Sequence, residues 1–456
     1  MKKTKWSVRL FALLSVLALV AAACGDGGGT STTAGGGEEP GTTTAETPDT
    51  TAAGGDGTTV PEGELGSVTV AAGDMIQIRS LNAISGETAT LGIPNQVAVE
   101  IAIEDYGPIK GHDVTIGTGL DDLCNAEGGQ AAAQTIAADE QVVGVIGTSC
   151  SGAAVAASPV ISDAGLVMIS PSNTSPALTS DLQGNPGTDY HPGYFRTAHN
   201  DLFQGQAVAN FVYNELGLTT AAAIHDGDPY TQGLAGAFQA AFEELGGTIT
   251  TFTGVNKGDT DMTPVLSEVA AGAPEAIYFP IFPPEGDFIV QQIGGVAGLE
   301  DVTLLAADGL LVANFLGLPE TAGMYFSGPS LQFGDNVNEI TGLSATDFLT
   351  AYEEREGEPP TAAFWAHAYD AATMLLAAID SVAVENADGS LTIDRQALRD
   401  AVAASDFDGM IGHLTCDEFG DCGSQEIQIV VHPDPSITDS TQLEVVYTYS
   451  GLEGGS

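Results

Sequence analysis

The chain has 456 residues, and its 43% content of hydrophobic residues is sufficient to build the cores of two or three domains. Only 11 Lys and Arg residues accompany 61 Asp and Glu residues, which gives a formal net charge of −50 at pH 7. A negative field of this strength argues against nucleic acid and anionic membrane surfaces as partners. The acidic residues have no EF-hand spacing, so the composition favours a solvated acidic surface over a specific cation site.

The first 23 residues have the pattern of a secretory signal peptide. Four of the first nine residues are basic, residues 10–20 are predominantly apolar, and three alanines precede Cys24. This apolar run is short for a membrane-spanning helix. A cysteine directly after small residues is typical of a lipoprotein signal, although Ala21 occupies the position where leucine is usual. We predict lipidation at Cys24 and anchoring to the outer face of the cell membrane; ordinary signal cleavage with a spare thiol is the alternative.

Residues 24–66 are rich in Gly, Thr, Glu and Pro and contain almost no large apolar residue. Such a segment cannot bury a core, so we predict a disordered, lipidated tether over this range. Its expected role is to let the folded part of the chain extend away from the membrane.

Residues 67–197 alternate between strand and helix patterns and are expected to form the first part of a lobe. Strands are predicted at residues 75–81 and 114–119, and helices at residues 93–106 and 131–138. The first helix has a proline at its second position, where a missing backbone N–H is tolerated. Strand and helix patterns that alternate in this way predict a parallel sheet with helical crossovers.

Two polar loops follow consecutive predicted strands. The strand at residues 142–146 leads into Gly-Thr-Ser-Cys-Ser at residues 147–151, and the strand at residues 166–169 leads into Ser-Pro-Ser-Asn-Thr-Ser at residues 170–175. Loops at the carboxyl ends of parallel strands are where ligands bind in open α/β sheets. Both loops offer hydroxyls and backbone N–H groups but no cation. They therefore suit a small carboxylate held by neutral donors near a helix N-terminus.

A second α/β series follows a Gly-, Pro- and Asp-rich insertion at residues 181–193. Its strands are predicted at residues 221–225, 248–252, 276–280 and 303–306, and its helices at residues 204–216, 231–245, 263–271 and 286–295. Further helices are predicted at residues 345–356, 362–379 and 395–404, the last with Asp394 as its N-cap, before a hairpin at residues 417–421. The chain should therefore contain two lobes of the same class.

Two segments, residues 145–179 with both polar loops and residues 222–233 (AAIHDGDPYTQG), resemble those of the branched-chain amino-acid-binding proteins. These proteins are the leucine/isoleucine/valine group of type I periplasmic binding proteins, which feed ABC importers. The likeness extends from about Ile76 to the C-terminal hairpin, and it is densest at Cys150-Ser151, residues 166–179 and residues 222–233. It implies two doubly wound, parallel-sheet α/β lobes joined by three hinge crossovers, two of which match residues 194–198 and 324–327. The implied division is residues 67–197 and 326–432 for the first lobe, residues 198–325 for the second, and residues 433–456 for the C-terminal crossover and tail.

Besides Cys24, the chain has four cysteines, an even number that suits disulfides in an exported protein. The sequence alone allows three pairings. Proximity along the chain favours Cys124 with Cys150 and Cys416 with Cys422, and the resembling family has a disulfide at the positions of the first pair. A zinc site would require a different spacing and nearby histidines.

Motifs of enzymes are absent or incomplete in this sequence. Residues 147–151 fail the G-x-S-x-G pattern of a nucleophile elbow at its last position. The sequence contains no Walker loop, no HExxH and no G-x-G-x-x-G after a strand, and its seven histidines are dispersed. We therefore predict no catalytic residue, no cofactor and no metal, and a surface hydrolase is the least favoured function.

The resemblance implies which residues hold a ligand. Ser151, Ser172 and Thr174 match positions whose hydroxyl or backbone groups bind the α-carboxylate and ammonium of an amino acid, although at the position of Ser172 the family mainly uses the backbone. Across the cleft, Asp308 matches an acidic position, generally glutamate, that pairs with the ligand ammonium. Because aspartate is one methylene shorter, the cleft must close further or a water must intervene. The alternative for Asp308 is a turn-forming Asp-Gly.

Two aromatic residues of the second lobe complete the predicted site. Tyr230 matches an aromatic residue that covers the ligand, with a surface aromatic as the alternative. Phe282 matches another cleft aromatic, although its neighbourhood FPIFPPEG departs from the family pattern. Leu91 stands where the family often has an aromatic residue and would leave an apolar wall.

The expected function is capture of a small amino acid by a monomeric, extracytoplasmic lipoprotein that delivers it to an ABC permease. Branched-chain amino acids are the favoured ligands. The ligand would bind the first-lobe loops, and the second lobe would then close over it because the closed state binds the ligand better. The alternatives are an amide, urea or aromatic-acid ligand, and a sensory role in which the closed lobes contact a membrane receptor.

Overall fold

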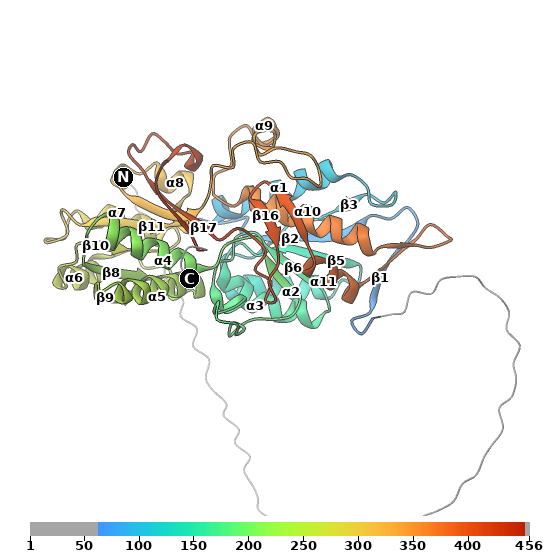
Figure 1. Ribbon diagram of the computed structural model, residues 1–456, viewed down its shortest axis with the longest axis horizontal. Coiled ribbons are helices and arrows are strands. Elements are labelled where there is room, and N and C mark those ends of the chain that lie inside the picture. Colours follow the sequence, from blue (N-terminus) through green and yellow to red (C-terminus); the bar gives the residue numbers. More distant parts are fainter. Residues whose placement is uncertain (1–62, 452–456) are drawn as a thin grey trace, which may run out of the picture. The chain divides into compact units, whose positions relative to one another are not determined.

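The computed structural model describes residues 63–451. The predicted signal peptide, Cys24 and residues 24–62 of the predicted tether lie outside the described residues. No helix within residues 63–451 is both long and apolar enough to span a bilayer. Two large sheets, one in each of two α/β lobes, organise this part of the chain (Figure 1).

The first lobe is built on a parallel sheet of six strands in the order β3-β2-β5-β6-β7, with β4 also pairing with β2. The strands are β2 Ile76–Asn82, β3 Val114–Thr115, β4 Leu120–Asp121, β5 Val142–Gly147, β6 Val167–Ser170 and β7 Tyr194–Arg196, and the helices that follow β2, β4 and β5 are α1 Ala89–Tyr106, α2 Ala126–Ala137 and α3 Ser151–Asp163. Val143 and Val167 share a core with α1 and α10, whereas Val145 and Met168 share one with α2 and α3. Both faces of the sheet are therefore buried, as a parallel sheet requires.

The second lobe is built on a sheet of seven strands in the order β18-β17-β12-β11-β10-β8-β9. The strands are β8 Thr220–His225, β9 Thr248–Gly254, β10 Ala276–Tyr278, β11 Thr303–Ala307, β12 Tyr325–Pro329, β17 Glu426–Val431 and β18 Glu444–Ser450, and the helices are α4 Asp201–Asn210, α5 Pro229–Glu244, α6 Thr263–Ala271, α7 Glu285–Ile293 and α8 Ala313–Leu316. Strands β8 to β12 are parallel, and β17 and β18 are antiparallel additions. The predicted class of two doubly wound α/β lobes is confirmed.

The remaining elements complete the described chain. The remaining strands are β1 Ser67–Val70, β13 Val384–Glu385, β14 Leu391–Asp394, β15 Asp406–Gly409 and β16 Gly412–Thr415. The remaining helices are α9 Ala345–Glu356, α10 Trp365–Val382 and α11 Arg395–Ala403. There is also a π-helical turn at Phe211–Glu215, and there are 3-10 turns at Pro176–Leu178, Asp308–Leu310, Pro319–Thr321 and Ser440–Gln442. The Asp394 side chain accepts a hydrogen bond from the backbone N–H of Ala397, so the predicted N-cap of α11 is confirmed.

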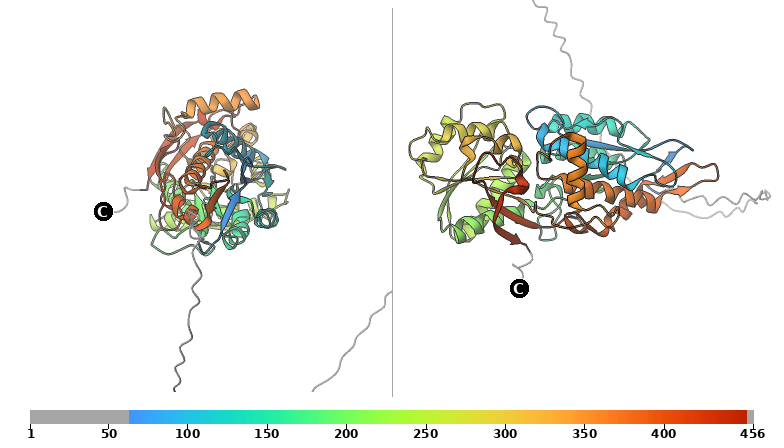
Figure 2. Two further views of the ribbon diagram at one scale, coloured as in Figure 1. Left: turned by 90° about the vertical axis from the view of Figure 1, so that its right-hand side faces the viewer. Right: turned by 90° about the horizontal axis from the view of Figure 1, so that it is seen from above.

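The chain crosses between the lobes three times. It passes from β7 to α4, which packs on β12 and β17, from β12 to α9, which packs on α1, and from β16 to β17. The view from above shows the elements around β8 to β12 grouped apart from those around β2 to β7 (Figure 2). These crossovers are the hinge that the fold class predicts.

Two strands lie elsewhere than the predicted division implies, namely β17 and all but the first residue of β12. Residues 326–432 were expected in the first lobe, but β17 pairs antiparallel with β12 in the second-lobe sheet, with Val430 opposite Phe326. The backbone groups along the open edge of β12 require partners, and β17 supplies them. The boundaries of the lobes otherwise remain a prediction.

Helix α1 begins four residues earlier than the sequence pattern predicts, so Pro94 lies inside it. Proline has no N–H to donate to the carbonyl oxygen of Thr90, one turn earlier. That oxygen instead accepts a hydrogen bond from the Thr361 hydroxyl at 2.9 Å. A side chain distant in sequence therefore supplies the hydrogen bond that Pro94 cannot make. The local sequence does not reveal this contact.

Both favoured disulfides are present. Cys124 is bonded to Cys150, and Cys416 is bonded to Cys422. The first bond joins the segment that precedes α2 to the residue that precedes α3, and thus holds the first of the two polar loops.

Candidate ligand-binding site

A cavity lies between the lobes, and its empty space of about 320 Å³ includes open solvent. Its lining from the first lobe is Leu91, Ser149, Ser151, Ser172 and Phe364, and its lining from the second lobe is Tyr230, Phe282, Asp308 and Gly309. Five of the six residues that the sequence singled out for ligand binding are therefore brought together here. Thr174, the sixth, does not line this inter-lobe cavity.

The first-lobe wall begins where β5 ends at Gly147. This residue has a φ of 143°, and a Cβ at its position would overlap the backbone carbonyl oxygen of Leu81. Only glycine fits this close approach of two neighbouring strands. The chain then turns through Ser149 and Cys150 into the N-terminus of α3, whose first residue is Ser151.

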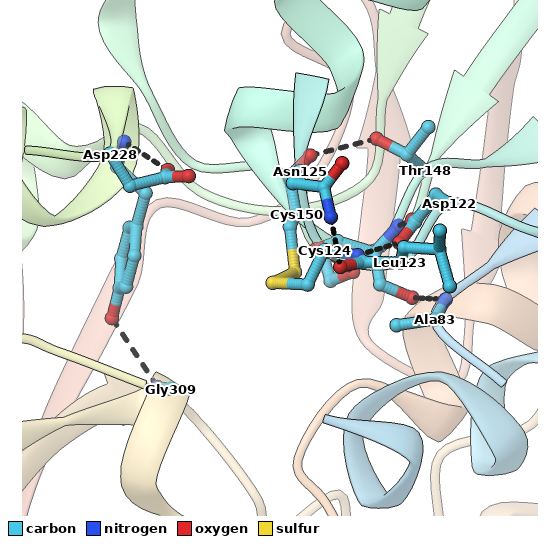
Figure 3. Close-up of a disulfide and its surroundings, with 12 residues drawn as sticks. Ala83, Asp122, Leu123, Cys124, Asn125, Thr148, Cys150, Asp228 and Gly309 are labelled. Atoms are coloured by element: carbon cyan, nitrogen blue, oxygen red, sulfur yellow. Dashed lines mark hydrogen bonds between the residues drawn. A yellow bond between two sulfur atoms is a disulfide. The ribbon is translucent and has the colours of Figure 1, made fainter. Parts of the chain in front are cut away.

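Asp122 holds this loop through hydrogen bonds to backbone N–H groups (Figure 3). One of its carboxylate oxygens accepts the backbone N–H of Cys124 at 2.7 Å, and the other accepts that of Ser149 at 2.6 Å. Burial raises the pKa of Asp122 to about 7, and these backbone hydrogen bonds partly offset the rise. The Asp122 contacts and the Cys124–Cys150 disulfide together fix the start of α3.

The hydroxyl groups of the three predicted first-lobe ligand residues differ in their hydrogen bonds. The Ser151 hydroxyl oxygen accepts the backbone N–H of Ser175 at 3.3 Å. The Ser172 hydroxyl donates to the backbone oxygen of Ser149 at 3.0 Å. The Thr174 hydroxyl is fully buried and makes no well-formed hydrogen bond among the described residues.

Arg196 supports the second polar loop from β7. Its Nη1 donates to the backbone oxygens of Asn173, at 3.1 Å, and Ser175, at 2.9 Å, which flank Thr174. Its Nε donates to the Asp421 carboxylate, and both side chains are buried. The charge of Arg196 is therefore paired with Asp421, and its side chain does not line the cavity.

The second-lobe wall is largely aromatic. The rings of Tyr230 and Phe282 lie with their centroids 5.1 Å apart. The Tyr230 hydroxyl oxygen accepts the backbone N–H of Gly309 at 3.3 Å (Figure 3), so the ring is fixed beside the residue that follows Asp308. With Leu91 and Phe364 on the opposite wall, these rings give the cavity its apolar surface.

Asp308 is the one acidic residue of the cavity lining. It follows β11 directly, is 4% exposed, and accepts a hydrogen bond from the Gln204 side-chain amide at 2.7 Å. Burial raises its pKa to about 6, although the neighbouring Gln204 and Tyr230 lower it. None of the ion pairs within residues 63–451 includes Asp308.

The structure adds residues that the sequence did not single out. Gln204 and Asp201 lie on the first two turns of α4, and Phe364 directly precedes α10. Neither carboxylate oxygen of Asp201 makes a well-formed hydrogen bond in the described structure. Burial, followed by the nearby Asp308 charge, raises its pKa well above the ordinary value, and the neighbouring Thr174 hydroxyl partly offsets the rise. Helix periodicity marks such positions only as buried, so no local signal separates them from core residues.

A metal centre is not indicated in the part of the chain that the structure describes. Residues 63–451 contain no group of three or more His, Cys, Asp or Glu side chains placed to hold a metal ion. The chemistry of the inter-lobe cavity is therefore that of hydroxyls, backbone donors, one carboxylate and an apolar wall.

Comparisons with known proteins agree in the class of protein they identify. A family model described as periplasmic binding protein matches residues 76–425. The Leu/Ile/Val-binding protein homolog 3 of Brucella melitensis biotype 1 is 28% identical over 379 residues, which are 82% of this chain and 95% of that protein. The crystal structure of the leucine binding protein LivK from Thermotoga maritima MSB8 has a TM-score of 0.68 and 24% identity, with 82% of this chain and 99% of that chain covered.

A further solved structure shares the fold. The solute binding protein of an ABC transporter from R. palustris, solved in complex with benzoate, has a TM-score of 0.64 and 18% identity, and the match covers 82% of this chain and 96% of that chain. At these identities, both crystal structures show a common fold and leave the ligand of the present chain to be argued from its own residues.

Proposed function

This chain belongs to the periplasmic binding protein family, and from that membership we propose that it captures a small amino acid between its lobes and delivers it to an ABC importer. Branched-chain amino acids are the proposed ligands. The proposal includes an extracytoplasmic location, lipid anchoring through Cys24, and action as a monomer that binds without catalysing a reaction.

The observation that carries the proposal is the buried carboxylate of Asp308. An ionised carboxylate in an apolar site requires a compensating cation or several donors. It accepts a hydrogen bond from the neutral Gln204 amide, and no Lys or Arg within residues 63–451 pairs with it. A ligand ammonium would supply the missing positive charge through a charge-assisted hydrogen bond.

The opposite wall suits the other end of an amino acid. Ser151 opens helix α3, whose N-terminal backbone N–H groups and dipole favour a negative charge. The hydroxyls of Ser151 and Ser172 lie on the same wall, and no cationic side chain lines the cavity. An α-carboxylate would therefore be held by neutral donors on the first lobe, with the α-ammonium directed to Asp308 on the second.

The remaining surface suits an aliphatic side chain. Leu91, Phe364, Phe282 and Tyr230 supply its apolar contacts. Leucine, isoleucine and valine meet these requirements of charge and apolarity.

We propose a two-step capture. The ligand first meets the first-lobe loops with Ser151 and Ser172, and closure then adds Tyr230, Phe282 and Asp308. Closure is favoured because the ligand contacts both lobes only in the closed state. The closed pair of lobes is the form that a permease would recognise.

An aromatic acid is the second candidate ligand. It is supported by the aromatic wall and by the shared fold of the benzoate-binding protein from R. palustris. Such a ligand has no ammonium and would leave Asp308 unpaired, which disfavours it.

A thermal-shift screen of the purified protein, freed of bound ligand, tests the proposal. Leucine, isoleucine and valine would be compared with benzoate, urea and short amides. A ligand at about 100 times its dissociation constant stabilises a protein by roughly 2.7 kcal/mol, which such a screen detects. Stabilisation by the branched-chain amino acids supports the proposal, whereas stabilisation only by ligands without an ammonium would overturn it.

A further inference from the structure

Lys257 makes a contact between the two lobes, outside the ligand cavity. It lies between β9 and α6 in the second lobe. Its Nζ donates to the backbone oxygen of Cys124, in the first lobe, at 3.3 Å. The same Nζ pairs with the Asp228 carboxylate at 3.1 Å and lies 5.7 Å from the centroid of the Phe282 ring. One cation thus joins the rim of the first lobe to an aromatic residue of the cavity.

Asp228 is held firmly at this rim. Its side chain is 4% exposed, and its Oδ1 accepts the backbone N–H of Tyr230 at 3.0 Å, which caps helix α5. Its Oδ2 is the oxygen that Lys257 contacts. Burial raises the pKa of Asp228, and Lys257 counteracts that rise. The two hydrogen bonds fix the carboxylate in one orientation.

The fixed carboxylate lies against the first lobe. A Cβ on Gly152, in the first turn of α3, would overlap Oδ2 of Asp228. Figure 3 shows Asp228 on the side of the site opposite the Cys124–Cys150 disulfide. The hydroxyl of Ser175 also reaches the backbone oxygen of Pro229 at 3.5 Å, from the first lobe to the second. Gly152 therefore permits an approach of the lobes that any larger residue would obstruct.

We propose that Lys257, Asp228, Gly152 and the Cys124 carbonyl form a latch that holds the lobes together and sets how long the ligand remains bound. The contacts of Lys257 to Cys124 and of Asp228 to Gly152 join different lobes, so they exist only when the lobes are closed. The latch therefore stabilises the closed state selectively, which slows ligand release. The part of this proposal that concerns ligand release rests on the proposed function, whereas the part that concerns lobe closure does not.

Gly152→Ala is the sharpest test, because it adds one methyl group at the point of closest approach. Gly236→Ala is its matched control: Gly236 lies within α5, and a Cβ there would meet nothing within 4 Å. Lys257→Met removes the cation, and Lys257→Arg restores it. The release of radiolabelled leucine into excess unlabelled leucine would be measured for each variant, together with the thermal midpoint of the ligand-free protein.

The expected result is release about tenfold faster for Gly152→Ala and Lys257→Met, the size of a lost hydrogen bond to a charged group. The release rates of Gly236→Ala and Lys257→Arg should stay near that of the unaltered protein. The ligand-free midpoint of Gly152→Ala should not fall, because the approach of Gly152 to Asp228 joins the lobes and builds neither one. Lys257→Met also loses its ion pair with Asp228 inside the second lobe, so its midpoint should fall and its release rate is the readout. Unchanged release from Gly152→Ala and Lys257→Met would overturn the latch and leave the proposed function intact.

If the unaltered protein binds no branched-chain amino acid, the proposed function fails. Lobe closure would then be measured in the ligand-free protein. Small-angle X-ray scattering would then compare the radius of gyration of the ligand-free protein with that of Gly152→Ala. A larger radius for Gly152→Ala, and not for Gly236→Ala, supports the latch. Equal radii overturn it.

Discussion

The side-chain amide of Gln204 donates to the Asp308 carboxylate at 2.7 Å, and this hydrogen bond joins the first turns of α4 to the cavity. The amide orientation is fixed at its other end, because His199 Nε2 lies 2.6 Å from Gln204 Oε1. Burial lowers the pKa of His199 to about 4, so near neutral pH the ring is uncharged and its Nε2–H donates. Gln204 thus positions Asp308 without neutralising it.

Asp308→Asn should weaken leucine binding by about 10- to 100-fold, the range expected for a hydrogen bond to a charged group. The substitution keeps the size of the side chain and removes its charge. Isothermal titration calorimetry would measure the affinity. Asp406→Asn, at a carboxylate that is 75% exposed on β15, is the control and should bind as the unaltered protein does. Tight leucine binding by Asp308→Asn would remove the assigned role of this carboxylate.

Leucine affinity should depend on pH through Asp308. Its pKa is about 6 in the ligand-free protein, and the ammonium requires the ionised carboxylate. Leucine itself keeps both charges between about pH 5 and pH 7. The dissociation constant should therefore rise up to about tenfold for each pH unit below 6 and be flat above about pH 7. Titrations at several pH values would show this slope in the unaltered protein, and the slope should be much reduced in Asp308→Asn.

The same carboxylate should destabilise the ligand-free fold at neutral pH. Its pKa rises from 3.8 to about 6 on folding, so between these values the native state binds more protons than the unfolded state. The free energy of unfolding therefore falls as the pH rises through this window, by roughly 3 kcal/mol in all from this group. Urea unfolding at about pH 5 and pH 7 should show Asp308→Asn gaining stability over the unaltered protein mainly at the higher pH. An equal difference at both values would contradict the assignment.

Thr174→Val should stabilise the ligand-free protein and leave leucine binding nearly unchanged, because Thr174 does not line the inter-lobe cavity. The hydroxyl of Thr174 is buried and makes no well-formed hydrogen bond among the described residues, although it lies near the Asp201 carboxyl, so a methyl group of the same size removes a poorly compensated polar atom. The expected gain is about 1 kcal/mol in the free energy of unfolding. Ser172→Ala is the comparison, because its hydroxyl already donates to Ser149 and its loss should destabilise the fold. If Thr174→Val destabilises the protein, the hydroxyl is compensated in the native state, and if it weakens leucine binding, the hydroxyl acts on the ligand site.

The sequence was informative where local pattern and position in the sheet agree. Strand ends and the family resemblance placed Ser151, Ser172 and Asp308, and the structure brings all three to one cavity. The α/β order of both lobes follows from apolar strands and helical spacing, which are local properties. The N-cap at Asp394 is local as well.

Features that depend on distant contacts were not predicted. Strand β1 pairs with β14 more than 300 residues later in the chain, and nothing in residues 67–70 indicates that partner. The role of Gln204 depends on Asp308, in the turn after β11, and on Ser327, in β12. The early start of α1 depends on Thr361. In each case the deciding hydrogen bond comes from a segment remote in sequence.

Arg196→Met should damage stability and ligand binding together. The guanidinium is fully buried, pairs with Asp421, and donates from Nη2 to the Thr179 hydroxyl at 2.7 Å. Removing it leaves the Asp421 charge buried without its cation, which destabilises a protein by about 3–5 kcal/mol. It also releases the backbone oxygens on both sides of Thr174, so the ligand loop loses its shape.

Arg355→Met is the matched control for this prediction, because Arg355 pairs with Glu100 and Glu104 at the surface and is 32% exposed. An exposed pair of this kind contributes about 0–1 kcal/mol. Urea unfolding and leucine titration of both variants would separate the two cases. Arg196→Met should lose stability and affinity, and Arg355→Met should keep both. If Arg196→Met remains as stable as Arg355→Met, the buried pair with Asp421 does not support the loop, and the shape of the site must come from the Cys124–Cys150 disulfide and Asp122 instead.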